Sequence, residues 1–206
     1  MVGTLPKSLA KLGIDARVIT PYHRVIKEKY ADRVEHMFHF FVQLGWRRQY
    51  AGIEKLVLDG VTIYLVDSEY YFGDKIYRGG VAEGEQYAFF TRAVMDCIPN
   101  LDFTPEVIHC NDWHTAMLPM LAKTQYHGAM QEKLRFLLTI HNIAFQGKFD
   151  FGYVQDLLGV LAVCFALLCV LASFGVGNLT QIGALTETAS AMGISPLLCG
   201  GVCGLL

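Results

Sequence analysis

Charge is scarce in the last quarter of this 206-residue chain, and its absence there divides the sequence in two. All 17 Lys and Arg residues lie at or before Lys148, and 18 of the 19 acidic residues lie at or before Asp156. From Leu157 onward the sole charged residue is Glu187. A charged body is therefore followed by an almost uncharged tail.

Other absences exclude whole classes of protein. Because 53% of the residues are apolar and only 17% are charged, the bulk of the chain is not disordered. A formal net charge of −2 leaves no basic excess for a dedicated nucleic-acid binder, so no nucleic-acid partner is expected. The N-terminus lacks the basic and apolar regions of a secretory signal, which predicts a cytoplasmic body. The G-x-S-x-G, P-loop and G-x-G-x-x-G motifs are also missing.

The six cysteines have no C-x-x-C spacing, which argues against a zinc finger or a dithiol redox motif. In the body, Cys97 and Cys110 are expected to be reduced and buried. The other four are expected to face lipid, and these are Cys164, Cys169, Cys199 and Cys203.

The body alternates between strand and helix patterns. Apolar periodicity predicts helices over residues 7–12, 83–98 and 112–126. Strands are predicted over residues 15–21, 34–44, 50–58, 61–66, 107–110 and 135–140. Asp59-Gly60 predicts a tight turn, and hence a hairpin, between two of these strands. Short apolar strands alternating with helices are typical of an α/β fold whose parallel sheet is covered on both faces.

The tail has a different character. Thirty uncharged residues separate Asp156 from Glu187, and residues 157–174 are almost wholly apolar. A membrane-spanning helix needs about 20 such residues, so a transmembrane helix is predicted here. The alternative is a buried core helix, although a soluble helix usually keeps one polar face. A second apolar segment begins near Ile194, after the Gly175–Asn178 stretch that would end the first.

Two polar clusters each follow a predicted parallel strand. One is His109–His114 and the other is His141–Gly147. Ligands of open α/β sheets bind at the carboxyl ends of strands, and adjacent strands lie about 4.8 Å apart, so neighbouring strands would bring the clusters together. Carboxylate and amide oxygens accept hydrogen bonds from hydroxyl groups, and an indole packs on the C–H face of a sugar. The clusters therefore predict a carbohydrate site.

Each of these residues also has a purely structural interpretation. Asp112 could cap the following helix, Trp113 could belong to the core, and His109 could be a satisfied buried histidine. A metal site made of His109, Asp112 and His114 matches no common spacing, so no metal is expected. A histidine directly after a strand, such as His141, favours a functional role.

Residues 1 to about 157 resemble the N-terminal domain of bacterial glycogen synthase and plant starch synthase. The matching stretches are Gly3–Leu9, Asp15–Tyr22, Tyr70–Gly73, Val107–His114 and Thr139–Gly147. The resemblance implies a Rossmann-like parallel sheet flanked by helices, the N-terminal half of a GT-B glycosyltransferase. It also implies retaining transfer of glucose from the donor ADP-glucose to the non-reducing end of an α-1,4-glucan, with no metal cofactor.

The resemblance also assigns roles to individual residues. His141 would lie against the transferred glucose and stabilise charge near the anomeric centre. The substrate-binding residues would be Asp112, Trp113, His114, Asn142, Gln146 and Tyr77. The family's Lys-Thr-Gly-Gly-Leu-Ala-Asp donor loop, its first strand and its C-terminal domain have no counterpart in these 206 residues. Because each missing charge-stabilising donor is commonly worth ~10² to 10³ in rate, the chain alone is expected to be inactive.

The tail resembles a different family. Ala172–Gln181 is similar to the stretch of sodium–alanine symporters in which a membrane helix unwinds around Gly-x-Gly-Asn. The two resemblances predict an incomplete synthase domain over residues 1–157 and a hydrophobic helical tail over 158–206. Their direct succession suggests a joined reading frame, with the boundary at 157–163. Two other functions therefore stay open, a membrane transport fragment and a non-catalytic glucan-binding module.

Overall fold

The computed structural model describes residues 3–126, 128, 133–150 and 156–157. The chain divides into two compact units, Met1–Gly159 and Val160–Leu206, and all described residues belong to the first. Nearly all of the predicted membrane helix, the symporter-like stretch and the four tail cysteines lie outside the described residues. No helix within the described ranges is long and apolar enough to cross a membrane.

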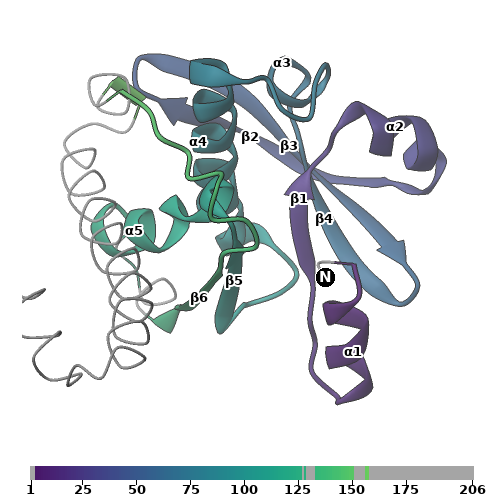
Figure 1. Ribbon diagram of the computed structural model, residues 1–206. Coiled ribbons are helices and arrows are strands. Elements are labelled where there is room, and N and C mark those ends of the chain that lie inside the picture. Colours follow the sequence, from purple (N-terminus) through teal and green to yellow (C-terminus); the bar gives the residue numbers. More distant parts are fainter. Residues whose placement is uncertain (1–2, 127, 129–132, 151–155, 158–206) are drawn as a thin grey trace, which may run out of the picture. The chain divides into compact units, whose positions relative to one another are not determined.

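The larger sheet has four strands in the order β1-β4-β3-β2 (Figure 1). They are β1 (Val18–Pro21), β2 (Glu35–Leu44), β3 (Arg47–Leu58) and β4 (Val61–Asp67). The predicted hairpin is confirmed as β3–β4, where Asp59 and Gly60 have φ angles of 52° and 79°. Both central residues of a type I′ turn require positive φ, which an Asp-Gly pair tolerates.

The predicted parallel sheet is found only in part in this region of the chain. Strands β1 and β4 are parallel, but β2, β3 and β4 form an antiparallel meander. The physical reason is the length of the connections. Two residues join β2 to β3 and two join β3 to β4, whereas a parallel crossover needs a dozen or more.

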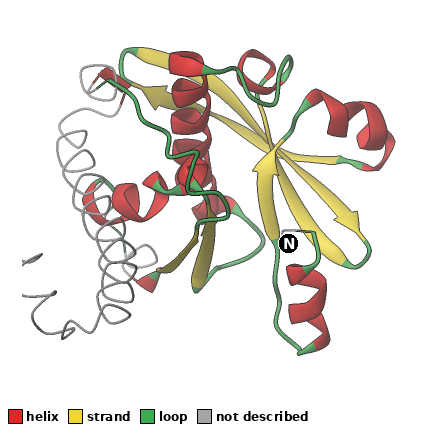
Figure 2. Cartoon of the chain, viewed as in Figure 1, coloured by secondary structure: helices red, strands yellow, loops and turns green. Residues whose placement is uncertain are grey.

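Five α-helices accompany the strands in the described ranges, and Figure 2 shows them in red. They are α1 (Leu5–Lys11), α2 (Arg24–Tyr30), α3 (Glu69–Phe72), α4 (Gly80–Cys97) and α5 (Met117–Thr124). The predicted helix over 83–98 is α4, and the one over 112–126 is divided into a 3-10 turn at 113–115 followed by α5. Helix α2 was not among the predicted helices, and none of its seven residues is buried.

The main core lies between α4 and the larger sheet. Val42, Leu44, Ala51 and Ile53 of the β2–β3 hairpin are fully buried, as is Phe89 of α4. Helix α4 contacts β2 and β4 of this sheet and also contacts α5. It therefore joins the larger sheet to the part of the chain that follows it.

The second sheet consists of β5 (Val107–Asn111) and β6 (Arg135–Thr139), which are parallel and pair Asn111 with Thr139. The prediction that these two strands are neighbours is confirmed. The prediction that both faces of this sheet are covered is confirmed only in part. Cys110 of β5 is 1% exposed, whereas Leu137 and Leu138 of β6 are 53% and 44% exposed. Within the described ranges no further strand pairs with β6, so its side chains lack neighbours on that side.

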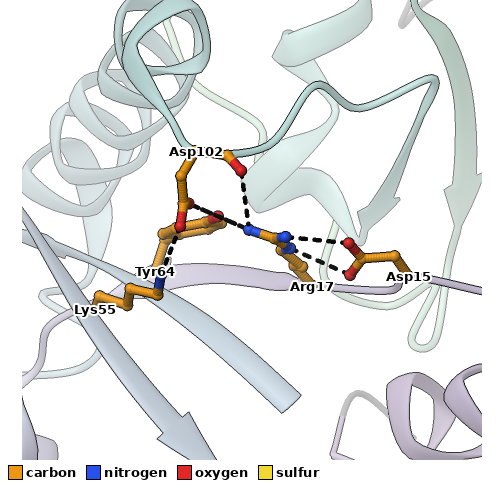
Figure 3. Close-up of polar contacts among 5 residues, drawn as sticks. All are labelled: Asp15, Arg17, Lys55, Tyr64 and Asp102. Atoms are coloured by element: carbon orange, nitrogen blue, oxygen red, sulfur yellow. Dashed lines mark hydrogen bonds and ion pairs between the residues drawn. The ribbon is translucent and has the colours of Figure 1, made fainter.

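A polar cluster attaches the loop that leads into β5 to the larger sheet (Figure 3). The Asp102 carboxylate accepts hydrogen bonds from Lys55 of β3, Tyr64 of β4 and Arg17, and Arg17 is also bonded to Asp15. The bonds from Lys55 and Tyr64 lower the pKa of Asp102 to about 2, whereas burial and the bond to Asp102 raise the pKa of Tyr64 to about 12. The cluster therefore holds the loop before β5 against β3 and β4.

Candidate functional site

Asp112 connects the ends of β5 and β6. Its backbone has φ 57° and ψ −176°, a region that is almost reserved for glycine. Its N–H donates to the Thr139 carbonyl at 2.8 Å, and its Oδ1 accepts from the backbone N–H of His141 at 2.6 Å. The N–H of Asn142 is 3.4 Å from the same oxygen. Asp112 occupies the N-cap position of the following 3-10 turn, but its side chain makes no capping bond there.

The side chain of His141 is held by Asn111, the last residue of β5. The His141 Nε2 lies 2.9 Å from Asn111 Oδ1, while Asn111 Nδ2 donates to the His109 carbonyl at 3.2 Å. Because the amide oxygen can only accept, Nε2 carries the proton of this hydrogen bond. Asn111 belongs to the first polar cluster, but no role was predicted for it. Its hydrogen bond with His141 depends on the β5–β6 register, which a single sequence does not reveal.

Trp113 is packed among rings and against Gly147. Its indole stacks on the His114 ring at a centroid distance of 4.2 Å and lies 5.3 Å from the Phe149 ring. A Cβ added at Gly147 would lie 2.4 Å from indole carbons Cδ2 and Cε3, and Gly147 has φ 59°. Trp113 therefore has the packing role that sequence analysis considered, and its contact with a sugar stays a prediction.

His114 is a half-buried ring whose Nε2 atom is buried. It packs against Tyr87 at 4.4 Å and Tyr77 at 5.8 Å. In the described part of the chain its Nε2 has no hydrogen-bond partner, and Oε1 of Glu83 is 3.9 Å away. Burial lowers the pKa of His114, so the ring is neutral at pH 7. An unpaired buried nitrogen costs free energy.

A hollow of about 340 Å³ opens beside these rings. Gly80 and Glu83 of α4, Trp113 and the loop 144–149 line it. Gln146 lies in this wall, and its side-chain amide donates to the Ile143 carbonyl at 3.0 Å. Glu83, whose Oε2 accepts from the Gly79 N–H at 2.8 Å, places a carboxylate in the wall that sequence analysis did not select. Only the tertiary contact between α4 and the end of β5 reveals it.

The residues predicted from sequence gather into one region. Asp112, His141 and Asn142 meet at one carboxylate, Tyr77, Trp113 and His114 form a row of rings, and Gln146 lines the adjoining hollow. His109 is a satisfied, half-buried histidine whose Nε2 lies 2.7 Å from the Thr139 hydroxyl. Among the residues with described positions, no group of three His, Cys, Asp or Glu side chains could hold a metal ion.

Comparison with known proteins decides the family. The starch synthase catalytic domain family matches residues 1–187. The chain belongs to this family. Two relatives are the glycogen synthases of Streptococcus pneumoniae strain CGSP14 and of serotype 19F strain G54, each 44% identical over 161 residues. The match covers 78% of this chain and 34% of each relative, so this synthase-family chain spans about a third of their length.

A solved structure supports the same fold. The catalytic domain of Starch Synthase IV from Arabidopsis thaliana, bound to ADP and acarbose, superposes with a TM-score of 0.64 and 20% identity. The superposition covers 73% of this chain and 31% of the plant chain. The synthase-family body is thus a mixed α/β domain of the GT-B kind, and the family resemblance is confirmed. The family match ends at residue 187 and so extends 30 residues beyond residue 157, the boundary predicted from the sequence.

Proposed function

We propose that this chain forms the acceptor-side wall of a cleft that transfers glucose from ADP-glucose to the non-reducing end of an α-1,4-glucan. The observation that carries the proposal is the convergence of Asn111, Asp112 and His141 at the ends of β5 and β6. Family membership supports it, as does the name glycogen synthase borne by the pneumococcal relatives. The plant neighbour bound to ADP and acarbose has the same fold.

In this proposal His141 is the catalytic residue. Retaining transfer of a glucosyl group develops positive charge at the anomeric carbon while negative charge grows on the leaving diphosphate. An imidazole whose Nε2–H is bonded to Asn111 directs Nδ1 away from Asn111, where a lone pair on that nitrogen can face developing positive charge. Asp112 holds the backbone of His141 and Asn142 through its carboxylate, so the ring is oriented before substrate arrives.

The remaining residues would bind the sugar. Asn142 and Gln146 supply exposed amide groups for hydrogen bonds to its hydroxyl groups, and the His114 ring lies beside them in the row of rings. Tyr77 is 62% exposed and offers a ring and a phenol at the edge of the same row. The hollow beside Trp113 has room for one sugar ring together with its hydroxyl groups. No step in the proposal uses a metal ion.

Transfer by the 206-residue chain alone is not expected. The leaving diphosphate carries negative charge, and the described residues lining the site include no arginine, with Lys148 as their sole lysine. The expected result of incubating the purified chain with radiolabelled ADP-glucose and glycogen is no incorporation above a boiled control. Incorporation that His141→Ala abolishes would contradict the proposed inactivity and support the proposed site.

Binding of an oligosaccharide tests the site without needing transfer. Maltotriose is expected to shift the NMR signals of the His141, Asn142 and Trp113 side chains in the full chain. Both His141→Ala and Trp113→Ala should weaken binding by about tenfold, because each removes one polar or stacking contact. The control is Val57→Ala, which truncates an exposed side chain of β3. Equal affinity of all four proteins would refute the site.

We propose further that the apolar stretch beginning at Leu157 directs the tail to membranes. The support is its sequence alone, since 30 successive residues lack charge. Flotation of the full chain with liposomes, compared with a chain ending at residue 157, tests this point. Recovery of both in the aqueous fraction would refute it. Sodium-dependent alanine uptake is not expected, and amplification across the codons for residues 157–163 from source DNA tests whether the two parts share one gene.

A further inference from the structure

Each of the two sheets has a parallel edge strand with one side open. Among the described residues, β1 pairs only with β4 and β5 pairs only with β6. Figure 1 shows β5 on the side of the smaller sheet that is nearer to β1. We call these two free edges together, residues 17–21 and 107–109, the strand slot.

The backbone of β1 uses every second residue to bond to β4. The Tyr22 N–H donates to the Val66 carbonyl at 2.9 Å, and the alternation along a strand means that Thr20 also bonds to β4. The N–H and C=O of Ile19 therefore point to the open side, where the described residues offer them no backbone partner. Pro21 points the same way, and a residue without an N–H is tolerated at such an edge.

The backbone of β5 alternates in the same manner. The Asp112 N–H donates to the Thr139 carbonyl at 2.8 Å, so the even-numbered residues of β5 bond to β6. The N–H and C=O of Val107 and the N–H of His109 point to the open side, and no described residue bonds to them. Asn111 closes this edge at its carboxyl end, because its side-chain amide donates to the His109 carbonyl at 3.2 Å.

A side chain links the amino ends of β1 and β5. Arg17, the residue before β1, donates to the Asp102 carboxylate at 3.2 Å (Figure 3). Its guanidinium also lies 4.4 Å from the centre of the Phe103 ring. Asp102 and Phe103 belong to the loop that leads into β5, so this end of the slot is held together.

The carboxyl ends of the two strands lie near one turn of α4. The His23 ring, which follows β1, is 5.4 Å from the Phe72 ring, and Phe72 is 5.9 Å from Phe89 of α4. Trp113, which follows β5, is 5.5 Å from Tyr87 of the same helix. Because both pairs of ends are linked, β1 and β5 lie alongside each other with their open sides in between.

The side chains along the slot are apolar and incompletely covered. Val18, Ile19 and Ile108 are half-buried, and Val107 is 59% exposed. Apolar strands of parallel sheets are normally covered on both faces. β1 and β5 belong to separate sheets and make no extensive contact with each other. The open backbone groups and the half-covered apolar side chains therefore occur at the same place.

We infer that the strand slot binds one extended apolar segment of another polypeptide, whose backbone bonds to β1 on one side and to β5 on the other. Strand addition of this kind takes its affinity from main-chain hydrogen bonds. Successive N–H groups of a strand point to opposite sides, so one set of alternate residues would bond to Ile19 and the other set to Val107 and His109. The slot is separate from the candidate glucan site, which lies at the carboxyl ends of β5 and β6.

Amide hydrogen exchange of the full 206-residue chain tests the slot, with the synthetic peptide acetyl-Lys-Val-Ile-Val-Val-Lys-amide as the probe. The peptide is expected to slow exchange at Ile19, Val107 and His109 by at least tenfold. Exchange at Thr20 and Ile108 should not change, because these residues already bond within their own sheets. No slowing at a saturating concentration of peptide would overturn the inference.

Exchange before the peptide is added is equally decisive. Ile19 and Val107 should then exchange at least tenfold faster than Thr20 and Ile108. Slow exchange at Ile19 and Val107 in the chain alone would overturn the inference, because a segment of the chain itself or a second copy would then occupy the slot.

Two N-methylated forms of the peptide distinguish a slot from a single sheet edge. Methylation of the odd-numbered residues removes the N–H groups that face one side of the bound strand, and methylation of the even-numbered residues removes those that face the other. Binding between β1 and β5 predicts that each form binds about tenfold more weakly than the unmodified peptide. If only one form binds more weakly, the peptide pairs with a single edge and the slot is refuted.

Val107 offers a matched pair of variants. Val107→Pro removes the N–H that faces the slot, whereas Val107→Ala keeps it, and neither change removes a bond to β6. Both variants should therefore unfold at similar urea concentrations, while Val107→Pro binds the peptide about tenfold more weakly than Val107→Ala. Equal affinity of the two folded variants would contradict the slot. Maltotriose affinity does not depend on these groups, so the slot and the proposed function can fail independently.

Discussion

Asp112 links the ends of β5 and β6 through its carboxylate, and we call this link the Asp112 clip. The carboxylate stabilises the fold while the strained backbone of Asp112 destabilises it, and different substitutions separate these two effects. Asp112→Ala removes the carboxylate that accepts from the N–H groups of His141 and Asn142. A hydrogen bond to a charged group contributes about 1.5–3 kcal/mol, and the bond at 3.4 Å is weak. We expect unfolding to become easier by about 2 kcal/mol, since Asp112 is only half-buried.

The backbone of Asp112 adds the second effect. A residue other than glycine at φ 57° and ψ −176° costs about 1–3 kcal/mol, and alanine retains that cost. Asp112→Gly loses the same carboxylate but relieves the strain. Its stability should therefore lie within about 1 kcal/mol of the unmodified chain. Asp112→Asn keeps an acceptor oxygen without the charge and should lose about 1 kcal/mol.

Denaturant unfolding and amide hydrogen exchange measure the two effects independently. Free energies of unfolding come from urea titrations of the three variants, and exchange reports on the His141 amide. Its protection should fall by roughly 30-fold in both Asp112→Ala and Asp112→Gly, the equivalent of about 2 kcal/mol. An unchanged exchange rate at His141 would refute the clip, and equal destabilisation by alanine and glycine would refute the strain.

Three further predictions concern the surroundings of the site. Gly147→Ala should destabilise the chain by about 1–3 kcal/mol in thermal melts, because the added Cβ would meet the Trp113 indole and the backbone at residue 147 has φ 59°. A melting curve like that of the unmodified chain would contradict this packing. Asp102→Asn should cost less than about 1 kcal/mol at pH 7, given the 44% exposure of the carboxylate. The depressed pKa of Asp102 stabilises the fold fully above the unfolded pKa of 3.8, and this stabilisation is lost as the pH falls from there toward 2, where the folded carboxylate also takes up a proton. The difference between the two proteins should therefore shrink over that range in urea titrations, and a difference that persists unchanged at pH 2 would count against the Lys55 and Tyr64 bonds. Burial lowers the pKa of His114, so the unfolded chain binds a proton at this residue more readily than the folded chain does. The free energy of unfolding should therefore decline as the pH falls through 6.5. His114→Gln should reduce this decline, which urea titrations at pH 5 and 8 measure.

Several helices and strands and most of the candidate site residues can be recognised from short stretches of the amino-acid sequence. Apolar periodicity identified α4, the Asp-Gly turn identified the β3–β4 hairpin, and the two polar clusters identified the strand ends where Asp112 and His141 lie. These features depend on side-chain pattern and turn chemistry within short windows, which a single sequence contains in full. The family resemblance rested on the same two clusters and was confirmed by comparison.

The hydrogen bonds and packing contacts between these residues depend on the tertiary structure. The partnership of Asn111 with His141 depends on the β5–β6 register, and the arrival of Glu83 beside His114 depends on how α4 packs near the end of β5. The antiparallel meander depends on connection lengths that determine strand direction, which the apolar pattern of a strand does not encode. Contacts between residues 29 or more positions apart are set by the packing of whole elements, and this is why the Asp112 carboxylate bonds the backbone that follows β6 and makes no capping bond to the turn that follows Asp112 itself.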